Sequence, residues 1–98
     1  MNTVKDEIKK LRKEIDNLDR QLLKLLSQRF LLSVRIGEIK KENKLDVIDP
    51  EREKKLFSML EKDGKDLGIN KEFVFKLWKQ IIDRSYSLQE KYNDDEKI

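Results

Sequence analysis

The chain has 98 residues, of which 44% are charged and only 37% are hydrophobic. This length and composition predict a single domain over residues 1–98, and no run of about 18 apolar residues is present that could cross a bilayer. Because the chain contains no Cys and no His, thiolate nucleophiles, disulfides, Cys/His zinc sites and imidazole bases are excluded.

Charges of both signs are mixed along the whole chain. Lys and Arg number 23 against 20 Asp and Glu, which gives a net charge of +3 at pH 7. Since the two signs are interspersed, they favour a small anionic ligand no less than a nucleic acid. The first ten residues lack the apolar stretch of a signal peptide, so we expect a soluble cytoplasmic protein.

The first predicted element is one long amphipathic helix over about residues 5–42. Its apolar residues are spaced by three and four, and they include Ile8, Leu11, Ile15, Leu18, Leu22, Leu25, Leu32, Ile36 and Ile39. Such a helix is about 57 Å long, whereas a compact chain of this size is about 33 Å across. We therefore expect at least a dimer, and the periodicity alone leaves open a plain homodimeric coiled coil with no ligand.

Two shorter helices are predicted next. Asp49 and Pro50 supply an N-cap and a proline at the first helical position, which predicts a helix over about residues 50–63 that stops near Gly64. Asn70 can cap a third helix over about residues 71–92. The predicted fold class is therefore all-α, with three helices per chain and a very long first helix.

Polar residues occupy several positions where the apolar faces of these helices should continue. They are two cations, a carboxylate, a hydroxyl and an amide, namely Arg29, Lys40, Glu53, Ser85 and Gln89, and Asp49 adds a second carboxylate at the start of the helix just below Glu53. A cation buried in an apolar face is costly unless an anion or a carboxylate meets it. The set suits a small polar anion held between helices, and an internal salt bridge of Arg29 or Lys40 with Glu53 is the alternative.

Short motifs run through nearly the whole chain. They are Leu11-Arg12-Lys13-Glu14-Ile15, Leu18-Asp19, Leu22-Leu23, Leu25-Leu26, Gln28-Arg29, Ile36-Gly37-Glu38-Ile39-Lys40, Val47-Ile48-Asp49-Pro50-Glu51-Arg52-Glu53, and Ile81-Ile82-Asp83-Arg84-Ser85 with Gln89. In this order and spacing the sequence resembles the all-helical (type II) chorismate mutases. The resemblance implies an intertwined homodimer, and an isomerase that converts chorismate to prephenate, in phenylalanine and tyrosine biosynthesis, by an intramolecular Claisen rearrangement without metal or cofactor.

The resemblance also implies a catalytic set of Arg29, Lys40 and Gln89. Arg12 and Arg29 would hold the carboxylates of the substrate. Lys40 would contact the ether oxygen and a carboxylate, and Gln89 would reach the same ether oxygen from the opposite side.

Further substrate-binding residues follow from the same resemblance. Glu53 would accept a hydrogen bond from the ring hydroxyl with help from the region of Asp49, and Ser85 would bond the ring carboxylate. Arg52 matches the family pattern without a defined role.

The length of the first helix tests whether one chain alone could hold the substrate with both Arg12 and Arg29. Arg12 and Arg29 are 17 residues apart, about 26 Å along a straight helix, which is too far for one chain to grip one small ligand with both. Antiparallel packing of two first helices about a point near Leu23 would place Arg12 of one subunit opposite Arg29 and Lys40 of the other.

Three other functions are weighed against the mutase. An isochorismate-pyruvate lyase has the same fold, but the intact segment from Asp49 to Glu53 together with Ser85 favours the mutase. A non-enzymatic helical dimerisation module leaves the polar residues on the apolar faces unexplained. Nucleic-acid binding is disfavoured because acidic residues interrupt the basic ones and no groove-reading motif is present.

Overall fold

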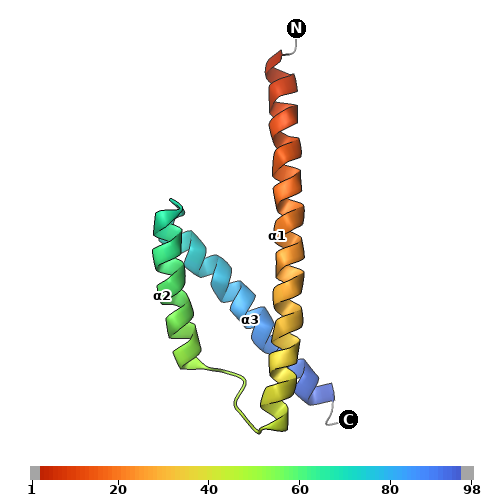
Figure 1. The fold of residues 1–98 in the computed structure, drawn as a ribbon, viewed down its shortest axis with the longest axis vertical. Coiled ribbons are helices and arrows are strands. Elements are labelled where there is room, and N and C mark those ends of the chain that lie inside the picture. The colour runs from red at the N-terminus through yellow and green to blue at the C-terminus, as the bar shows by residue number, and fades with distance from the viewer. Residues whose placement is uncertain (1–2, 96–98) are drawn as a thin grey trace. The chain divides into compact units, whose positions relative to one another are not determined.

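The structure, a computed structural model, describes the backbone of residues 3–95 and the side chains of residues 3–90. It contains α1 (Thr3–Glu42), α2 (Pro50–Asp66) and α3 (Lys71–Asp95), with no strand in the described range (Figure 1). The predicted all-α class with three helices is confirmed. The chain divides into two compact units, one up to Leu31 and one from Leu32 onward, and the single domain over residues 1–98 stays a prediction. None of the helices, over the residues described, is long and apolar enough to cross a membrane.

The first unit is the first part of α1, and it carries an exposed apolar stripe. None of residues 3–31 is buried. The stripe residues are spaced alternately by four and three and are 42–68% exposed, namely Val4, Ile8, Leu11, Ile15, Leu18, Leu22 and Leu25. This heptad spacing is typical of a helix that packs along a second helix, so the stripe has the pattern of a contact surface.

The end of α1 is closed by a turn that contains a left-handed residue. The Leu45 N–H donates to the Lys40 carbonyl at 2.8 Å, and the Lys44 N–H donates to the Lys41 carbonyl at 3.2 Å. These two bonds form a Schellman motif, in which the residue after the helix takes a positive φ. That residue is Lys44, with φ 54°, where glycine would avoid the steric cost of a Cβ.

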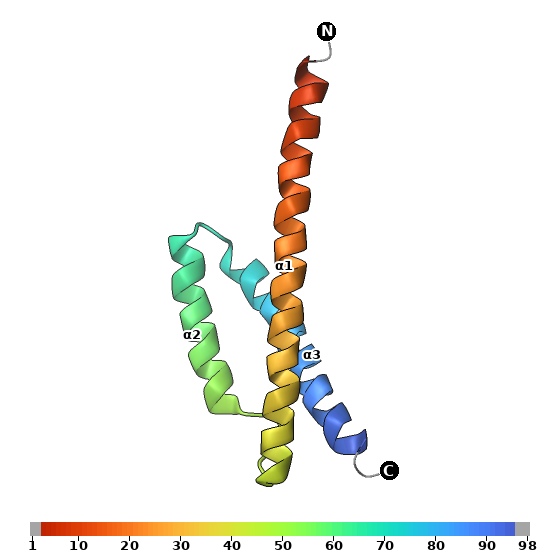
Figure 2. The ribbon, with the colours of Figure 1, turned by 45° about the vertical axis from the view of Figure 1, so that its right-hand side comes forward.

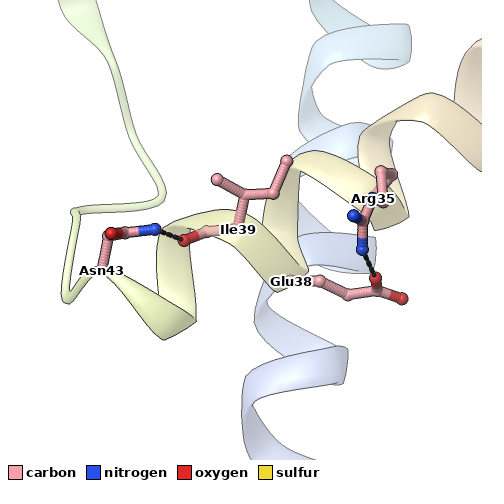
Figure 3. A network of polar contacts seen from close by, with 4 residues as sticks. All are labelled: Arg35, Glu38, Ile39 and Asn43. Atoms are coloured by element: carbon pink, nitrogen blue, oxygen red, sulfur yellow. Dashed lines mark hydrogen bonds and ion pairs between the residues drawn. The ribbon is translucent and has the colours of Figure 1, made fainter.

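Side chains add to the bonding of this last turn (Figure 3). Asn43 Nδ2 donates to the Ile39 carbonyl at 2.8 Å, and the same carbonyl accepts from the Asn43 N–H at 3.1 Å. One turn earlier, Arg35 Nη1 and Glu38 Oε2 form an ion pair at 2.8 Å. An exposed pair at this spacing contributes about 0.2–0.5 kcal/mol, so the backbone bonds dominate the end of α1.

Both predicted N-caps are confirmed. Asp49 Oδ1 accepts from the Arg52 N–H at 3.1 Å, and Pro50 stands at the first helical position of α2. Asn70 Oδ1 accepts from the Phe73 N–H at 3.0 Å at the start of α3. Each cap satisfies an N–H that has no partner within its own helix.

The predicted end of α2 near Gly64 is wrong. The helix continues to Asp66, and Gly68, with φ 71°, supplies the left-handed residue of a second Schellman motif. Its two bonds run from the Ile69 N–H to the Gly64 carbonyl, at 2.8 Å, and from the Gly68 N–H to the Lys65 carbonyl, at 3.1 Å. Gly64 itself is buried inside the helix, so its role lies in packing. The predicted end of α3 near residue 92 is likewise short of Asp95.

The hydrophobic core lies between α2 and α3, which a short turn joins (Figure 2). Its buried residues are Leu56, Leu60, Val74 and Ile82, with Phe57, Phe75, Trp78 and Tyr86 packed against them. The rings of Phe57 and Phe75 meet edge to face with centroids 4.9 Å apart, a favoured geometry for aromatic pairs. This core fixes α2 and α3 together.

The second part of α1 approaches the backbone of α3 at one glycine. Gly37 is buried, and a Cβ built on it would lie 2.9 Å from the Gln89 Cα. Real Cβ atoms do not approach that closely, so only glycine permits this contact. The close approach brings Lys40, one helical turn after Gly37, next to Gln89.

Candidate active site

Lys40 is held at the centre of a polar cluster in the second unit. Its Nζ donates to Gln89 Oε1 at 3.0 Å and to the Val47 carbonyl. The cation comes from α1, the amide from α3 and the carbonyl from the segment that joins α1 to α2. These bonds use two of the three N–H groups of the ammonium and fix its position, which leaves the third for a ligand.

Gln89 presents a buried amide beside this cation. The residue is 5% exposed, and its Oε1 accepts from Lys40. The two N–H donors of its Nε2 therefore point away from Lys40. A cation and an oriented amide thus offer hydrogen-bond donors from two helices to one small oxygen-rich ligand.

Two buried serines lie on the helices that carry Lys40 and Gln89. Ser85 is 5% exposed, and its Oγ donates to the Ile81 carbonyl at 3.0 Å. Ser33, on α1, is 6% exposed. Because the Ser85 hydroxyl is bonded to its own helix, it would have to rotate in order to donate to the carboxylate of a ligand.

The N-terminus of α2 meets α3 through Tyr86. The Tyr86 hydroxyl accepts from the Asp49 N–H at 3.3 Å, and the Glu53 carboxylate acts on it through hydrogen bonding and charge, both of which raise the pKa of the phenol. Burial raises the pKa of the phenol above its usual 10.0; the Asp49 N–H opposes this rise, and the Glu53 carboxylate adds to it. Tyr86 therefore keeps its proton, and the hydroxyl donates to Glu53.

The tyrosine ring also joins this group to the lysine. Lys40 Nζ lies 6.0 Å from the centroid of the Tyr86 ring, at the outer limit for a cation–π contact. Lys40, Gln89, Asp49 and Glu53 therefore belong to one connected set, and Tyr86 is its common neighbour.

Of the predicted site residues, the structure brings together those of the second unit. Lys40 and Gln89 are bonded directly, and Asp49 and Glu53 both interact with Tyr86. Ser85 lies one turn before Gln89 on α3 and bonds to its own helix, and the roles of all five residues toward a substrate stay predictions. The alternative Lys40–Glu53 salt bridge does not form between these two described side chains, since Lys40 bonds to Gln89 and Val47 instead.

The predicted arginines contribute differently. Arg12 is exposed and Arg29 half-buried, and both belong to the first unit, so their roles in holding carboxylates stay predictions. Arg52 is exposed, and its backbone N–H bonds to the Asp49 cap; its side-chain role also stays open.

Sequence reasoning missed three members of this site. Tyr86 follows Ile82 by four residues, so helical spacing alone would have placed it on the buried face. Gly37 carried a signal as well, since a glycine inside a long helical pattern often marks a close approach. The Val47 carbonyl had no signal, because a backbone acceptor in a connecting segment does not depend on the side chain.

The arrangement acts through fixed charges and oriented hydrogen bonds. The second unit carries a lysine bonded to an amide, and a tyrosine hydroxyl that interacts with Asp49 and Glu53, which suits an anionic ligand that also carries a hydroxyl group. Among the described residues, no group of three or more acidic side chains is placed to hold a metal ion.

Comparisons with known proteins agree on one family. Residues 11–90 match the family model for chorismate mutase type II. A bifunctional chorismate mutase/prephenate dehydratase of Aquifex aeolicus is 38% identical over 89 residues, which are 88% of this chain but 25% of that protein. A chorismate mutase of Methanocaldococcus jannaschii is 29% identical over 90 residues, 92% of this chain and 91% of that protein.

The chain therefore spans about a quarter of the bifunctional relative and most of the single-function one. Because the family model covers most of the sequence, including every residue of the polar cluster, this chain belongs to the type II chorismate mutase family.

Proposed function

We propose that the chain is a chorismate mutase, an isomerase that converts chorismate to prephenate in aromatic amino acid biosynthesis in the cytoplasm. The observation that carries the proposal is the contact of Lys40 Nζ with Gln89 Oε1 at 3.0 Å. It joins a cation and an amide at positions that the family resemblance assigns to the ether oxygen of the substrate.

The reaction matches the residue types of the chain. In this rearrangement a C–O bond breaks and a C–C bond forms within one molecule, so no nucleophile or general base is required. A sequence without Cys or His therefore lacks no group that this reaction requires. The protein has to fold the substrate into its reactive conformer and stabilise the charge that develops on the ether oxygen.

Lys40 and Gln89 are the groups proposed to stabilise that oxygen. The ammonium is held by two hydrogen bonds and the amide is buried, so neither has to reorganise greatly during the reaction. Removing one preorganised donor of this kind typically costs about 10²–10³-fold in rate. Ile81 and Ile82, about two turns before Gln89 on α3, are also buried, which favours a dry environment, in which such interactions are stronger.

The proposed active form is a homodimer. The exposed heptad stripe of α1 provides a surface for a second helix. In an antiparallel pair, Arg12 of one subunit would serve the site that contains Lys40 and Gln89 of the other, and Arg29 would hold the second carboxylate of the substrate. This arrangement makes each site depend on both chains.

Incubation of the purified chain with chorismate tests the proposal. We expect the ultraviolet absorbance of chorismate to decrease and prephenate to be identified chromatographically. With Arg29→Ala, the absorbance should stay constant and no prephenate should form. Lys40→Ala should lose turnover while circular dichroism still reports a helical protein. If chorismate is untouched but isochorismate releases pyruvate, the lyase of the same fold is correct; if neither reacts, the proposed activity is wrong.

A further inference from the structure

Tyr86 has no role in the reaction proposed above, yet it contacts three of the residues that do. Its hydroxyl lies 3.3 Å from the Asp49 N and bonds to Glu53, and its ring lies 6.0 Å from Lys40 Nζ. We infer that Tyr86 is a positioning residue, whose hydroxyl aims the Glu53 carboxylate at the substrate and ties the start of α2 to α3. This inference rests on the proposed function.

The first turn of α2 depends on this link. The apolar contacts between α2 and α3 are made by Leu56, Phe57 and Leu60, which lie about two to three turns beyond the Asp49 cap. Before them, α2 is preceded by a segment without regular structure, residues 43–49. The Asp49–Tyr86 bond is therefore the polar contact that fixes the cap, and with it the first turn that carries Glu53.

The hydroxyl can serve both neighbours at once because it has one donor and two acceptor positions. It accepts from the Asp49 N–H, and its own proton is left for the Glu53 carboxylate, whose hydrogen bonding and charge both raise the pKa of the phenol. Burial chiefly raises the pKa of the phenol, and the Glu53 carboxylate adds to this, so the hydroxyl keeps the proton that it would donate. One rotamer of Glu53 is thereby favoured before any substrate binds.

Glu53 needs such a constraint because its side chain has three rotatable bonds. In addition, Glu53 is only half-buried, so packing alone does not fix its rotamer. A carboxylate that accepts from a substrate hydroxyl contributes most when its orientation is set in advance. Tyr86 supplies the orientation without touching the substrate. The expected effect of losing the hydroxyl is therefore smaller than that of losing the carboxylate.

The decisive variant is Tyr86→Phe, which removes only the hydroxyl and retains the ring beside Lys40. We expect kcat/KM for chorismate to fall about tenfold, with the larger part in KM, because the contact to the ring hydroxyl is present in the ground state as well. Ser87→Ala is the matched control, since Ser87 is exposed on the same helix, and it should behave like the unmodified chain.

A double-mutant cycle separates positioning from a general structural effect. If Tyr86 acts through Glu53, Tyr86→Phe should have little further effect on kcat/KM in a Glu53→Ala background, which has no acceptor at this position. The same fold-loss in both backgrounds, or an unchanged kcat/KM for Tyr86→Phe alone, would overturn the inference. Circular dichroism of each variant establishes that it is folded. A folded unmodified chain with no turnover would instead overturn the proposed function, so the two failures are distinguishable.

Discussion

Gly37 and Gln89 lie so close that a Cβ added to the glycine would meet the Gln89 Cα at 2.9 Å and its Cβ and Cγ at 3.1 Å. The nearest of these atoms belongs to backbone, so it cannot be moved by a rotamer change. This contact sets the separation of α1 and α3 at the point where Lys40 and Gln89 bond.

Gly37→Ala should therefore separate the two helices. We expect a loss of about 1–3 kcal/mol in the free energy of unfolding, as for other overpacked contacts, and a loss of chorismate turnover well beyond what that destabilisation explains. Thermal unfolding and steady-state kinetics measure the two effects. Gly64→Ala is the control, because its Cβ would meet Val74 at an ordinary 3.6 Å and should stabilise the helix by up to about 1 kcal/mol. Equal behaviour of the two variants would contradict the role of Gly37.

The proposed shared site predicts complementation between two inactive variants. Arg12→Ala and Arg29→Ala should each be inactive alone, because every site lacks one arginine. A mixed dimer has one site with both arginines intact and one site with neither. After complete subunit exchange, about a quarter of the unmodified activity should return, since half of the dimers are mixed and half of their sites are intact.

The control for this experiment is Arg29→Ala mixed with a second, differently tagged sample of Arg29→Ala. Co-purification of the two tags shows that subunits have exchanged. Activity that stays at the level of the separate variants, despite exchange, would mean that both arginines serve the site from one chain or that Arg12 has no part in it.

α1 and α2 each end in a turn that contains one residue with a left-handed backbone conformation, Lys44 and Gly68 respectively. Substitutions at these two residues should have opposite effects on stability. Lys44, with φ 54°, bears the cost of a Cβ in a conformation that glycine adopts freely, so Lys44→Gly should stabilise the chain by about 0.5–1 kcal/mol. Gly68, with φ 71° and open space around it, should lose about 1 kcal/mol as Gly68→Ala. Midpoints of chemical denaturation measure both. Shifts of the same sign would refute the explanation.

The Tyr86 phenol predicts a change of stability at alkaline pH. Its folded-state pKa is raised above 10.0, chiefly by burial, so the protonated form is favoured in the folded state. This contribution to stability is complete below about pH 10 and is lost as the pH rises through the folded-state pKa. The difference in unfolding free energy between the unmodified chain and Tyr86→Phe should therefore shrink in that range. A difference that grows with pH would show that the phenol ionises more easily in the folded state.

Local signals predicted much of this fold correctly. Asp49 with Pro50 and Asn70 act within their own first turns, so the sequence around them suffices to place the starts of α2 and α3. Lys40 and Gln89 were identified because each interrupts an apolar face, and the structure joins them directly. In both cases the decisive information is helical periodicity, which depends on near neighbours.

The features that the sequence did not predict depend on residues that are far apart in the chain. Gly64 was expected to end α2, but a glycine costs a helix only about 1 kcal/mol, and its burial beside Val74 decides its place. Helical spacing could place Tyr86 on the buried face but not identify its partners, Asp49 and Glu53, which belong to the cap and first turn of α2. Which residues face each other across two helices depends on how the helices are set against each other, and no local pattern of residues specifies that.

The exposed stripe from Val4 to Leu25 has a consequence for how the protein behaves on dilution. Residues 3–31 bury no side chain of their own, and a solitary helix in water gains little from its own hydrogen bonds. In the proposed dimer, the order of this segment and the association of two chains would be a single equilibrium. Activity per chain would then rise with protein concentration and fall on dilution, because mass action sets the fraction of complete sites.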